Sequence, residues 1–424
     1  MTPPLPGGYR VVEVPESRKD EFTEIDQLAF GFEPDAETAA QVPLTLEWDR
    51  TMGVEDPEGH LAAVHASFEF LLPVPGGASV PCAGLTWVGV RPDQRRRGLL
   101  SAMIDTHFER SLHRGEPVSA LYAAEHTIYG RFGYGSAADE VSLTLARRAA
   151  LREVAGSDEL TVRFGRLDPA VHSPLVEKVL DEAGAARPGW IRRRTDELQR
   201  RALSDPPAWR EGAEPLRIVT VHGPDGAPRA YALLRRKEQW VDNVARSTVQ
   251  VRESSAVDAA SAHRLWSFML DMDLTSSVRT GRLAVDDRLR TLLLDPRSSE
   301  PRISDNVWVR LLDVPAALGA RRWSAPLDVV LEVSDRLVPA NAGRWRLTTG
   351  ATAPDGTSEA RVVRTDEPAD VTLDVSDLGA AYLGGRSLQA AGRAGLVTEH
   401  RAGTLQATST AFSWPSAPLC NWGF

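Results

Sequence analysis

LTWVGVRPDQRRRGLLSAM, residues 85–103, carries the strongest structural signal in this chain. An apolar strand ends at a turn with Pro92, a basic loop containing Arg95 and Arg96 follows, and an amphipathic helix begins after Gly98. The first amides of a helix have no partner inside it, and the helix dipole favours anions at that end. Because a glycine also lets the main chain approach a ligand closely, the stretch predicts a pyrophosphate site. A solvated arginine loop before an ordinary helix is the alternative interpretation.

On both sides of this stretch, segments with apolar residues at every second position, typical of strands, follow segments with apolar residues every three or four positions, typical of helices. Residues 20–30 and 99–113 repeat apolar side chains every three or four positions, which predicts two helices. A glycine-rich segment, IYGRFGYG at residues 128–135, follows later. We expect strands at residues 9–14, 60–70, 83–90, 118–123 and 140–145, with the first domain ending near residue 151.

The rest of the chain divides into two further segments. Residues 216–222 and 230–236 flank GPDGAPR and predict a β-hairpin, and residues 256–271 then predict a long helix. This order echoes the first domain but lacks a glycine-bearing turn before the helix, so a duplicated domain here would have lost its ligand loop. Short strands dominate the remainder. We predict an α+β protein with mixed α/β sheets and three domains, at residues 1–151, 152–298 and 299–424.

Length and composition fit a globular protein of several domains. At roughly 150 residues per domain, 424 residues make about three domains. The formal net charge of −9 argues against nucleic acid as a partner. Two cysteines, Cys82 and Cys420, leave no disulfide framework and no cysteine-based zinc site, so we expect no metal cofactor. No apolar run approaches the roughly 20 residues of a membrane helix, and we expect a cytoplasmic protein with no membrane partner.

The order V-x-V-x-P-x-x-R-R-x-G after a strand resembles the acetyl-CoA motif of the GCN5-related N-acetyltransferase (GNAT) superfamily. The spacing from Arg95 to Gly98 fits that motif, whereas Leu100 stands where glycine or alanine is commoner. The resemblance implies that the strand is splayed here and that its main chain pairs with the pantetheine arm of acetyl-CoA. The residues it implies for acetyl-CoA binding are Val88, Val90, Arg95, Arg96, Gly98, Leu99 and Leu100.

Residues 128–135 look like the superfamily's Tyr-x-x-x-Gly-Phe/Tyr segment, in which the tyrosine lies beside the coenzyme sulfur. That residue is Tyr129 here. The departing thiolate needs a proton, and a phenol with a pKa near ~10 is protonated at neutral pH and can donate it. A core tyrosine under a loop is the structural alternative, and Tyr134 is the competing candidate for the acid.

A narrower resemblance covers nearly the whole chain. Residues 128–135, 263–274, 307–318 and 370–385, with the aromatic C-terminus, look like the enhanced-intracellular-survival (Eis) family of actinobacteria. This resemblance implies tandem GNAT folds, the second degenerate, followed by a sterol-carrier-like α+β domain, and assembly as a homo-oligomer, a hexamer. It also implies acetylation of primary amines of aminoglycosides, and of some lysines and peptides.

The family also implies that the chain's own terminal carboxylate acts as the base in the first domain. Here that carboxylate belongs to Phe424, at the end of an aromatic tail that Pro415 and Pro418 stiffen. A tail that only plugs a groove for stability is the alternative interpretation. Phe30, Phe32 and Glu125 are the expected substrate-binding residues, and His126 would be the base of a more generic acetyltransferase.

We therefore expect an N-acetyltransferase that binds acetyl-CoA and an aminoglycoside-like amine together and transfers the acetyl group directly. Phe424 would take the amine proton, and Tyr129 would protonate the thiolate. Two alternatives remain at this point: a protein or peptide lysine acetyltransferase, and a non-catalytic protein that binds lipid or coenzyme.

Overall fold

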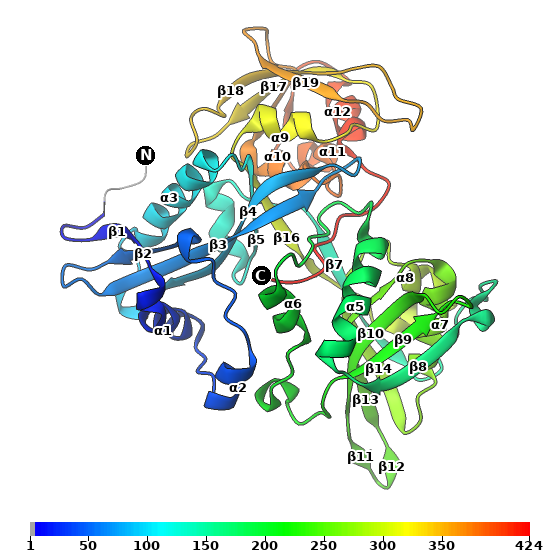
Figure 1. The fold of residues 1–424 in the computed structure, drawn as a ribbon. Helices are drawn as coiled ribbons and strands as arrows, with labels where there is room; N and C mark the ends of the chain where they lie inside the picture. Colours follow the sequence, from blue (N-terminus) through cyan, green and yellow to red (C-terminus); the bar gives the residue numbers. More distant parts are fainter. Residues whose placement is uncertain (1–4) are drawn as a thin grey trace.

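Three large β-sheets organise the chain, each at the centre of one unit (Figure 1). The computed structural model describes residues 5–424. The first sheet has seven strands in the order β1-β2-β3-β4-β5-β16-β6. Its strands are β1 (Arg10–Glu13), β2 (Thr51–Glu55), β3 (Leu61–Pro73), β4 (Ser79–Val90), β5 (Val118–Tyr122), β16 (Val307–Leu311) and β6 (Gly135–Ser136).

Helices α1 (Lys19–Phe30) and α3 (Leu99–His113) cover the first sheet from its two sides (Figure 1). Apolar residues every three or four positions turn one stripe of each helix toward the sheet. From α1, Phe22 and Ile25 are buried against Val64 of β3, whereas Met103 of α3 packs against Ala63, the preceding residue of that strand. Two short helices complete the unit, α2 (Ala36–Gln41) and α4 (His126–Tyr129).

The second sheet repeats the plan of the first. Its order is β15-β7-β14-β13-β10-β9-β8, and its central pair β13–β14 is parallel, as β4–β5 is in the first sheet. The strands are β7 (Asp139–Ala146), β8 (Thr161–Arg166), β9 (Arg217–His222), β10 (Pro228–Lys237), β13 (Ser247–Ala256), β14 (Thr275–Ala284) and β15 (Arg302–Asp305). The helices are α5 (Pro169–Gly184), α6 (Asp196–Leu203), α7 (Ala259–Leu270) and α8 (Arg288–Leu292), and a small hairpin joins β11 (Trp240–Val241) to β12 (Val244–Ala245).

The two sheets exchange strands. Strand β7, which follows the first unit in the chain, pairs with β14 and β15 of the second sheet. Strand β16, which follows the second unit, pairs in return with β5 and β6 of the first sheet. The sheets therefore cross the domain limits expected at residues 151 and 298, because each sheet is completed by a strand from the other side of the limit.

The third sheet follows the order β19-β18-β17-β20-β21. Its interior is filled by aromatic side chains, with the rings of Trp323 and Phe412 4.7 Å apart and both fully buried. The buried carboxylate of Asp335 accepts two hydrogen bonds from Arg310 of β16, at 2.7 and 2.8 Å, which joins this unit to the first sheet. The elements are β17 (Asp328–Ser334), β18 (Gly343–Thr349), β19 (Ala360–Arg364), β20 (Val371–Asp374), β21 (Thr398–Glu399), α9 (Val314–Ala320), α10 (Val375–Ala381), α11 (Leu388–Arg393) and α12 (Thr404–Phe412).

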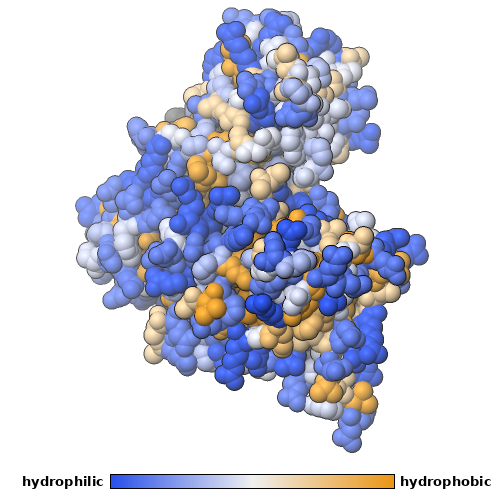
Figure 2. Space-filling model, turned by 45° about the vertical axis from the view of Figure 1, so that its right-hand side comes forward, coloured by the Kyte–Doolittle hydropathy of each residue, from blue (hydrophilic) through white to orange (hydrophobic). Residues whose placement is uncertain are grey.

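The molecular face in Figure 2 is mainly hydrophilic, with apolar residues in separate groups. Within residues 5–424, each helix is too short or too polar to cross a membrane.

Candidate active site

Strands β4 and β5 separate partway along the first sheet. They pair in parallel at three positions, of which Gly84–Ala120 is the last. Beyond that point β5 is paired only on its other edge, with β16, while β4 runs on beside β3 to Val90. The main chain of β4 from Leu85 onward therefore has an open side, available to an extended ligand.

A β-bulge sits in the open part of β4. The register against β3 shifts between Val64 and Ala66, and Trp87 has a φ of 53°. A residue with a large side chain rarely adopts this left-handed region, which is found where surrounding structure holds it. The bulge turns the Trp87 side chain into a cavity beside α1, where its ring also lies 6.2 Å from that of Phe22.

The loop between β4 and α3 has the geometry of an anion site. Gly98 occupies the N-cap position of α3 with a φ of 81°, and no side chain caps the helix. The side chains of Arg95 and Arg96 are exposed next to it, whereas Leu99 is buried and Leu100 half-buried. The first amides of α3 thus remain free to bind an anion, with two guanidinium groups nearby.

The corresponding helix of the second sheet is closed to such a ligand. The carboxylate of Asp258 accepts a hydrogen bond from the amide of Ser261 at 2.8 Å at the start of α7, and the Ser261 hydroxyl lies 3.3 Å from the Asp258 amide. A negative side chain already occupies the place that a phosphate would take. The second unit has therefore kept the strand–helix–strand plan but not the anion site.

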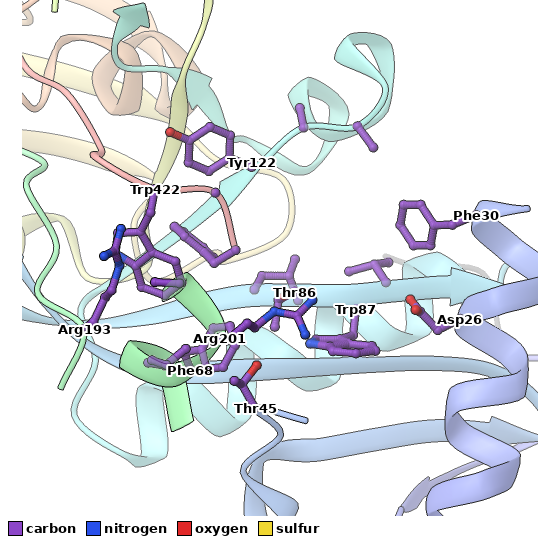
Figure 3. Close-up of a pocket in the computed structure, with 18 of the residues that line it drawn as sticks. Asp26, Phe30, Thr45, Phe68, Thr86, Trp87, Tyr122, Arg193, Arg201 and Trp422 are labelled. Atoms are coloured by element: carbon purple, nitrogen blue, oxygen red, sulfur yellow. The ribbon is translucent and has the colours of Figure 1, made fainter. Parts of the chain in front are cut away.

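A cavity of about 700 Å³ lies between the first two units, at the open side of β4. Figure 3 shows Asp26 and Phe30 of α1 at one end, Tyr122 and Trp422 at the other, and Arg201 reaching from α6 toward Trp87. Its walls come from Asp26, Phe30, Phe32, Thr45, Phe68, Leu85, Thr86, Trp87, Val88, Tyr122, Ala123, Ala124, Tyr129, Arg193, Leu198, Arg201, Ala202, Trp209, Arg252, Glu253, Arg282, Trp422, Gly423 and Phe424.

The two tyrosines considered for the acid occupy different environments. Tyr129, at the end of α4, lines the cavity, and burial together with the nearby Glu125 charge raises its pKa to about 12. The Tyr134 side chain lies in the core, where its hydroxyl is 2.8 Å from the Ser119 hydroxyl, which is also 2.8 Å from Nε2 of His107. Only Tyr129 of the two is in a position to reach a ligand in the cavity.

The C-terminal segment is docked into the same cavity. The amide of Cys420 donates to Oδ1 of Asn306 at 2.7 Å, and the indole of Trp422 donates to the carbonyl of Ile191 at 3.0 Å. The Phe424 ring makes edge-to-face contacts with Phe70, at a centroid distance of 4.8 Å. These contacts hold residues 420–424 between the first two units, where the C label of Figure 1 also lies.

The other expected substrate residues divide between the cavity and the surface. Phe30 and Phe32 line the cavity and are about half exposed. Glu125 is an exposed residue at the N-cap of α4 and is not part of the cavity wall. The neighbouring His126 is also exposed, with its ring 4.8 Å from that of Trp308. Val88 reaches the cavity, whereas Val90 lies further along β4.

Several wall residues were not among the sequence candidates. Asp26 is a buried carboxylate whose pKa burial raises to about 6, against the attraction of Arg201. Arg193, Arg201 and Arg252 come from the second unit, and no local motif marks them. Within residues 5–424 there is no group of three or more His, Cys, Asp or Glu side chains arranged to hold a metal ion, and both cysteine thiols are buried and free.

Comparison with known proteins identifies a matching domain family for each of the three units. Models described as an acetyltransferase (GNAT) domain match residues 10–137 and residues 189–311, and a sterol carrier protein domain matches residues 314–421. The chain is 40% identical to an uncharacterized N-acetyltransferase of Streptomyces avermitilis, over 93% of this chain and 95% of that one. It is also 33% identical to N-acetyltransferase Eis of Mycobacterium tuberculosis, over 83% of this chain and 80% of the relative.

This chain belongs to the Eis family of N-acetyltransferases. The expected order of tandem GNAT folds and a sterol-carrier-like domain is confirmed. Among solved structures, Eis1 from Mycobacterium abscessus superposes with a TM-score of 0.80 at 30% identity, covering 98% of this chain and all of that one. As an Eis family member, the protein is an acetyl-CoA-dependent acyltransferase.

Proposed function

We propose that this protein transfers the acetyl group of acetyl-CoA directly to a primary amine of a small molecule held in the cavity between the first two units. The observation that carries the proposal is that one cavity of about 700 Å³ is bordered by the open main chain of β4 at Val88, by Tyr129 and by Phe424. A thioester, an acid and a carboxylate can therefore meet there, which is what direct transfer requires.

In the proposed reaction the amine nitrogen attacks the thioester carbonyl carbon, a C–N bond forms and the C–S bond breaks. Main-chain N–H groups near Val88 polarise the carbonyl oxygen. The Phe424 carboxylate takes a proton from the nitrogen, and Tyr129 gives one to the leaving thiolate. The raised pKa of Tyr129 supports its part, because it keeps the phenol protonated at neutral pH.

The acyl donor is proposed to lie along β4 with its phosphates at the start of α3. The uncapped amides behind Gly98, at Leu99 and Leu100, and the exposed guanidinium groups of Arg95 and Arg96 support this orientation. The pantetheine arm would pair with the main chain around Val88 and Val90, on the side that β5 leaves open.

The identity of the amine is the finer part of the proposal. The family resemblance predicts an aminoglycoside-like polyamine, with lysine side chains as the alternative. An aminoglycoside and a lysine side chain would both react by the transfer described above. They differ in the rest of the molecule that the cavity must accommodate.

The test is release of coenzyme A thiol from acetyl-CoA in the presence of an aminoglycoside, a polyamine and a lysine-containing peptide, each measured against a reaction without amine. Amine-dependent thiol release with at least one class is the expected result. If none of these amines increases thiol release above the reaction without amine, the proposal is wrong.

We also propose a homo-oligomer, a hexamer, as the family resemblance implies. Light scattering coupled to size-exclusion chromatography measures the molar mass directly, and a monomer of 46.2 kDa would contradict it.

A further inference from the structure

The second unit has a gap between its two central strands, as the first unit has. Strands β13 and β14 pair in parallel as far as Val251 and Thr280. Beyond those residues β13 continues beside β10 to Ala256, and β14 continues beside β7 to Ala284. We call the space between the two diverging strands the slot. Because the corresponding space of the first unit opens into the cavity of about 700 Å³, the slot is where a second ligand would be expected.

The chain itself fills the slot. Figure 1 shows residues 413–424, which we call the tail, in red, running from α12 to the C label. Leu419 and Asn421 of the tail are buried and border the slot together with Ser254 of β13 and Leu283 of β14. The two gaps that remain beside these residues measure about 20 and 60 Å³. The slot therefore has no room for a coenzyme and holds the tail instead.

Two charged side chains of the second unit bind both main-chain polar groups of Ala417. Oδ2 of Asp286, just after β14, accepts a hydrogen bond from the Ala417 amide at 2.9 Å. Nη1 of Arg187 donates to the Ala417 carbonyl at 2.5 Å and to Oδ1 of Asp286 at 2.7 Å. The ion pair between the two side chains keeps both of them turned toward the tail. We call Arg187 and Asp286 the clamp.

The loop that follows the clamp arginine is shaped to lie against the tail. The carbonyl of Pro188 accepts a hydrogen bond from the Leu419 amide at 3.0 Å, and the carbonyl of Ile191 accepts one from the Trp422 indole at the same distance. Gly189 has a φ of 84°, and a Cβ there would come within 3.2 Å of the Leu419 carbonyl group. A larger residue would press on the tail. Successive residues of this loop thus contact successive residues of the tail.

The clamp is placed to fix a position more than to stabilise the fold. The side chains of Arg187 and Asp286 are 22% and 37% exposed, and an ion pair that water reaches contributes little to global stability. Two hydrogen bonds to the same residue, in contrast, restrict where the following residues can go. The segment from Ala417 onward is the part of the tail that leads into the cavity.

We propose that Arg187 and Asp286 are positioning residues of the acetyl transfer, because they hold the tail in the slot so that the Phe424 carboxylate reaches the cavity. The inference rests on the proposed function, in which that carboxylate takes the amine proton. A tail that is already held places the base before the amine arrives, which lowers the entropic cost of the reaction. The second unit, whose helix α7 lacks an anion site, then takes part in the transfer by presenting the tail.

The first test is the double variant Arg187→Ala with Asp286→Ala, which removes both side-chain contacts to Ala417 and leaves the net charge unchanged. With the amine that gives the fastest thiol release in the test above, we expect kcat to fall about tenfold. KM for acetyl-CoA should change less than about twofold, because the proposed coenzyme contacts come from the first unit. A loss carried by KM for acetyl-CoA with kcat retained would contradict the positioning role.

Asp181→Ala combined with Arg192→Ala is the matched control. Nε of Arg192 lies 3.1 Å from Oδ1 of Asp181, in an ion pair of the same unit. Neither residue borders the cavity or the slot, so this variant should keep the parent kcat and a similar melting temperature. Arg187→Lys, which keeps a cationic donor for the Ala417 carbonyl, should retain more of kcat than Arg187→Ala. Equal losses in those two variants would contradict the contact.

Hydrogen exchange of the tail reports its position without any turnover. In the clamp variant the amide of Cys420 keeps its own acceptor, Oδ1 of Asn306. Faster exchange at this amide and beyond it therefore means that the tail as a whole has loosened, not that one amide has lost its partner. Mass spectrometry of the C-terminal peptide should show residues 419–424 exchanging about tenfold faster in the clamp variant than in the control.

The two measurements together separate this inference from the proposed function. Unchanged exchange in the clamp variant would overturn the inference and leave the proposed function in place. Faster exchange with the kcat of the control would overturn the positioning role and contradict the Phe424 carboxylate as the base. Faster exchange in a protein whose thiol release no amine increases would support the hold of the clamp on the tail and contradict the proposed function.

Discussion

The hydroxyl of Tyr122 donates a hydrogen bond to the carbonyl oxygen of Cys420 at 2.9 Å. Asn306, just before β16, donates to the same carbonyl at 3.1 Å and accepts from the amide of Cys420. Burial raises the pKa of Tyr122 well above its ordinary value, so the hydroxyl stays a donor at neutral pH. The tail is therefore held by residues on or beside β5 and β16, the strand pair that the exchange between sheets brings together.

Replacing Tyr122 by phenylalanine should lower kcat by about tenfold with little change in KM for acetyl-CoA, because the tail loses a hydrogen bond worth about 1 kcal/mol and positions Phe424 less well. Tyr382→Phe is the matched control. Its hydroxyl donates to the carbonyl of Ala317 at 2.9 Å in the third unit, and Tyr382 is not part of the cavity wall. Steady-state kinetics and melting temperatures of both variants check this, and equal kcat values in the two would contradict it.

Adding two glycines after Phe424 should abolish acetyl transfer without unfolding the protein. The extension leaves every side chain intact but moves the carboxylate proposed as base away from the cavity. The same two residues at the N-terminus are the control, and circular dichroism verifies the fold. A C-terminally extended enzyme as fast as the control would exclude the Phe424 carboxylate and leave His126 and Glu125 as the next candidates for the base.

Tyr129→Phe should lower kcat by about one to three orders of magnitude and nearly retain the affinity for acetyl-CoA, because the phenol acts on the leaving thiolate and not on the phosphates. Tyr134→Phe removes a hydroxyl from the core instead and should affect stability more than rate. With a pKa of about 12, Tyr129 stays protonated through the usual assay range, so it causes no loss of rate below about pH 10. An unchanged kcat in Tyr129→Phe would remove it from the mechanism.

Arg95→Ala combined with Arg96→Ala should raise KM for acetyl-CoA and make its binding less sensitive to salt, because charge-assisted contacts to phosphate are lost. Arg361→Ala combined with Arg393→Ala, at two exposed arginines of the third unit, controls for the change in net charge. Calorimetry of coenzyme A binding at low and high salt tests whether Arg95 and Arg96 contact the phosphates. Affinity and salt dependence that match the control would mean that the loop is merely solvated.

Asp26→Asn should raise the melting temperature at about pH 8 but not at about pH 4. The folded-state pKa of Asp26 lies above its ordinary value of 3.8, at about 6. The folded protein therefore binds this proton more tightly than the unfolded chain does, and stability falls as the pH rises through that interval, by about 2–3 kcal/mol at most. Glu24→Gln, at an exposed carboxylate of the same helix, is the control. A gain that does not depend on pH would contradict the burial argument.

The local parts of this structure could be predicted from the sequence. The glycine at residue 98 and the apolar spacing behind it predict α3 with its open N-terminus, because a turn, a cap and a helix stripe are encoded by neighbouring residues. Strand β14 was missed for a physical reason. Its bulge at Gly281 and Arg282 shifts the register, so buried and exposed positions do not alternate along it.

The residues of the candidate site also divide into those that the local sequence predicts and those that only the tertiary fold brings together. Tyr129 was predicted because it lies in a glycine-rich segment with a recognisable order of residues. Arg201 and Arg252 were not, since nothing near them in the sequence differs from an ordinary surface arginine. They become wall residues only when the second unit packs against the first, which is a property of the tertiary fold.

The exchange of strands β7 and β16 between the first two sheets affects how the nascent chain can fold during translation. As the chain leaves the ribosome, the edge of β5 opposite β4 has no neighbour until Val307–Leu311 is synthesised, so the first sheet remains incomplete while the whole second unit is being made. An apolar strand edge that stays unpaired during the synthesis of the second unit can pair with strands of other chains. Translation arrested before residue 311 should therefore leave nascent chains that depend on chaperones, and a gene fragment encoding the first unit alone should yield aggregates.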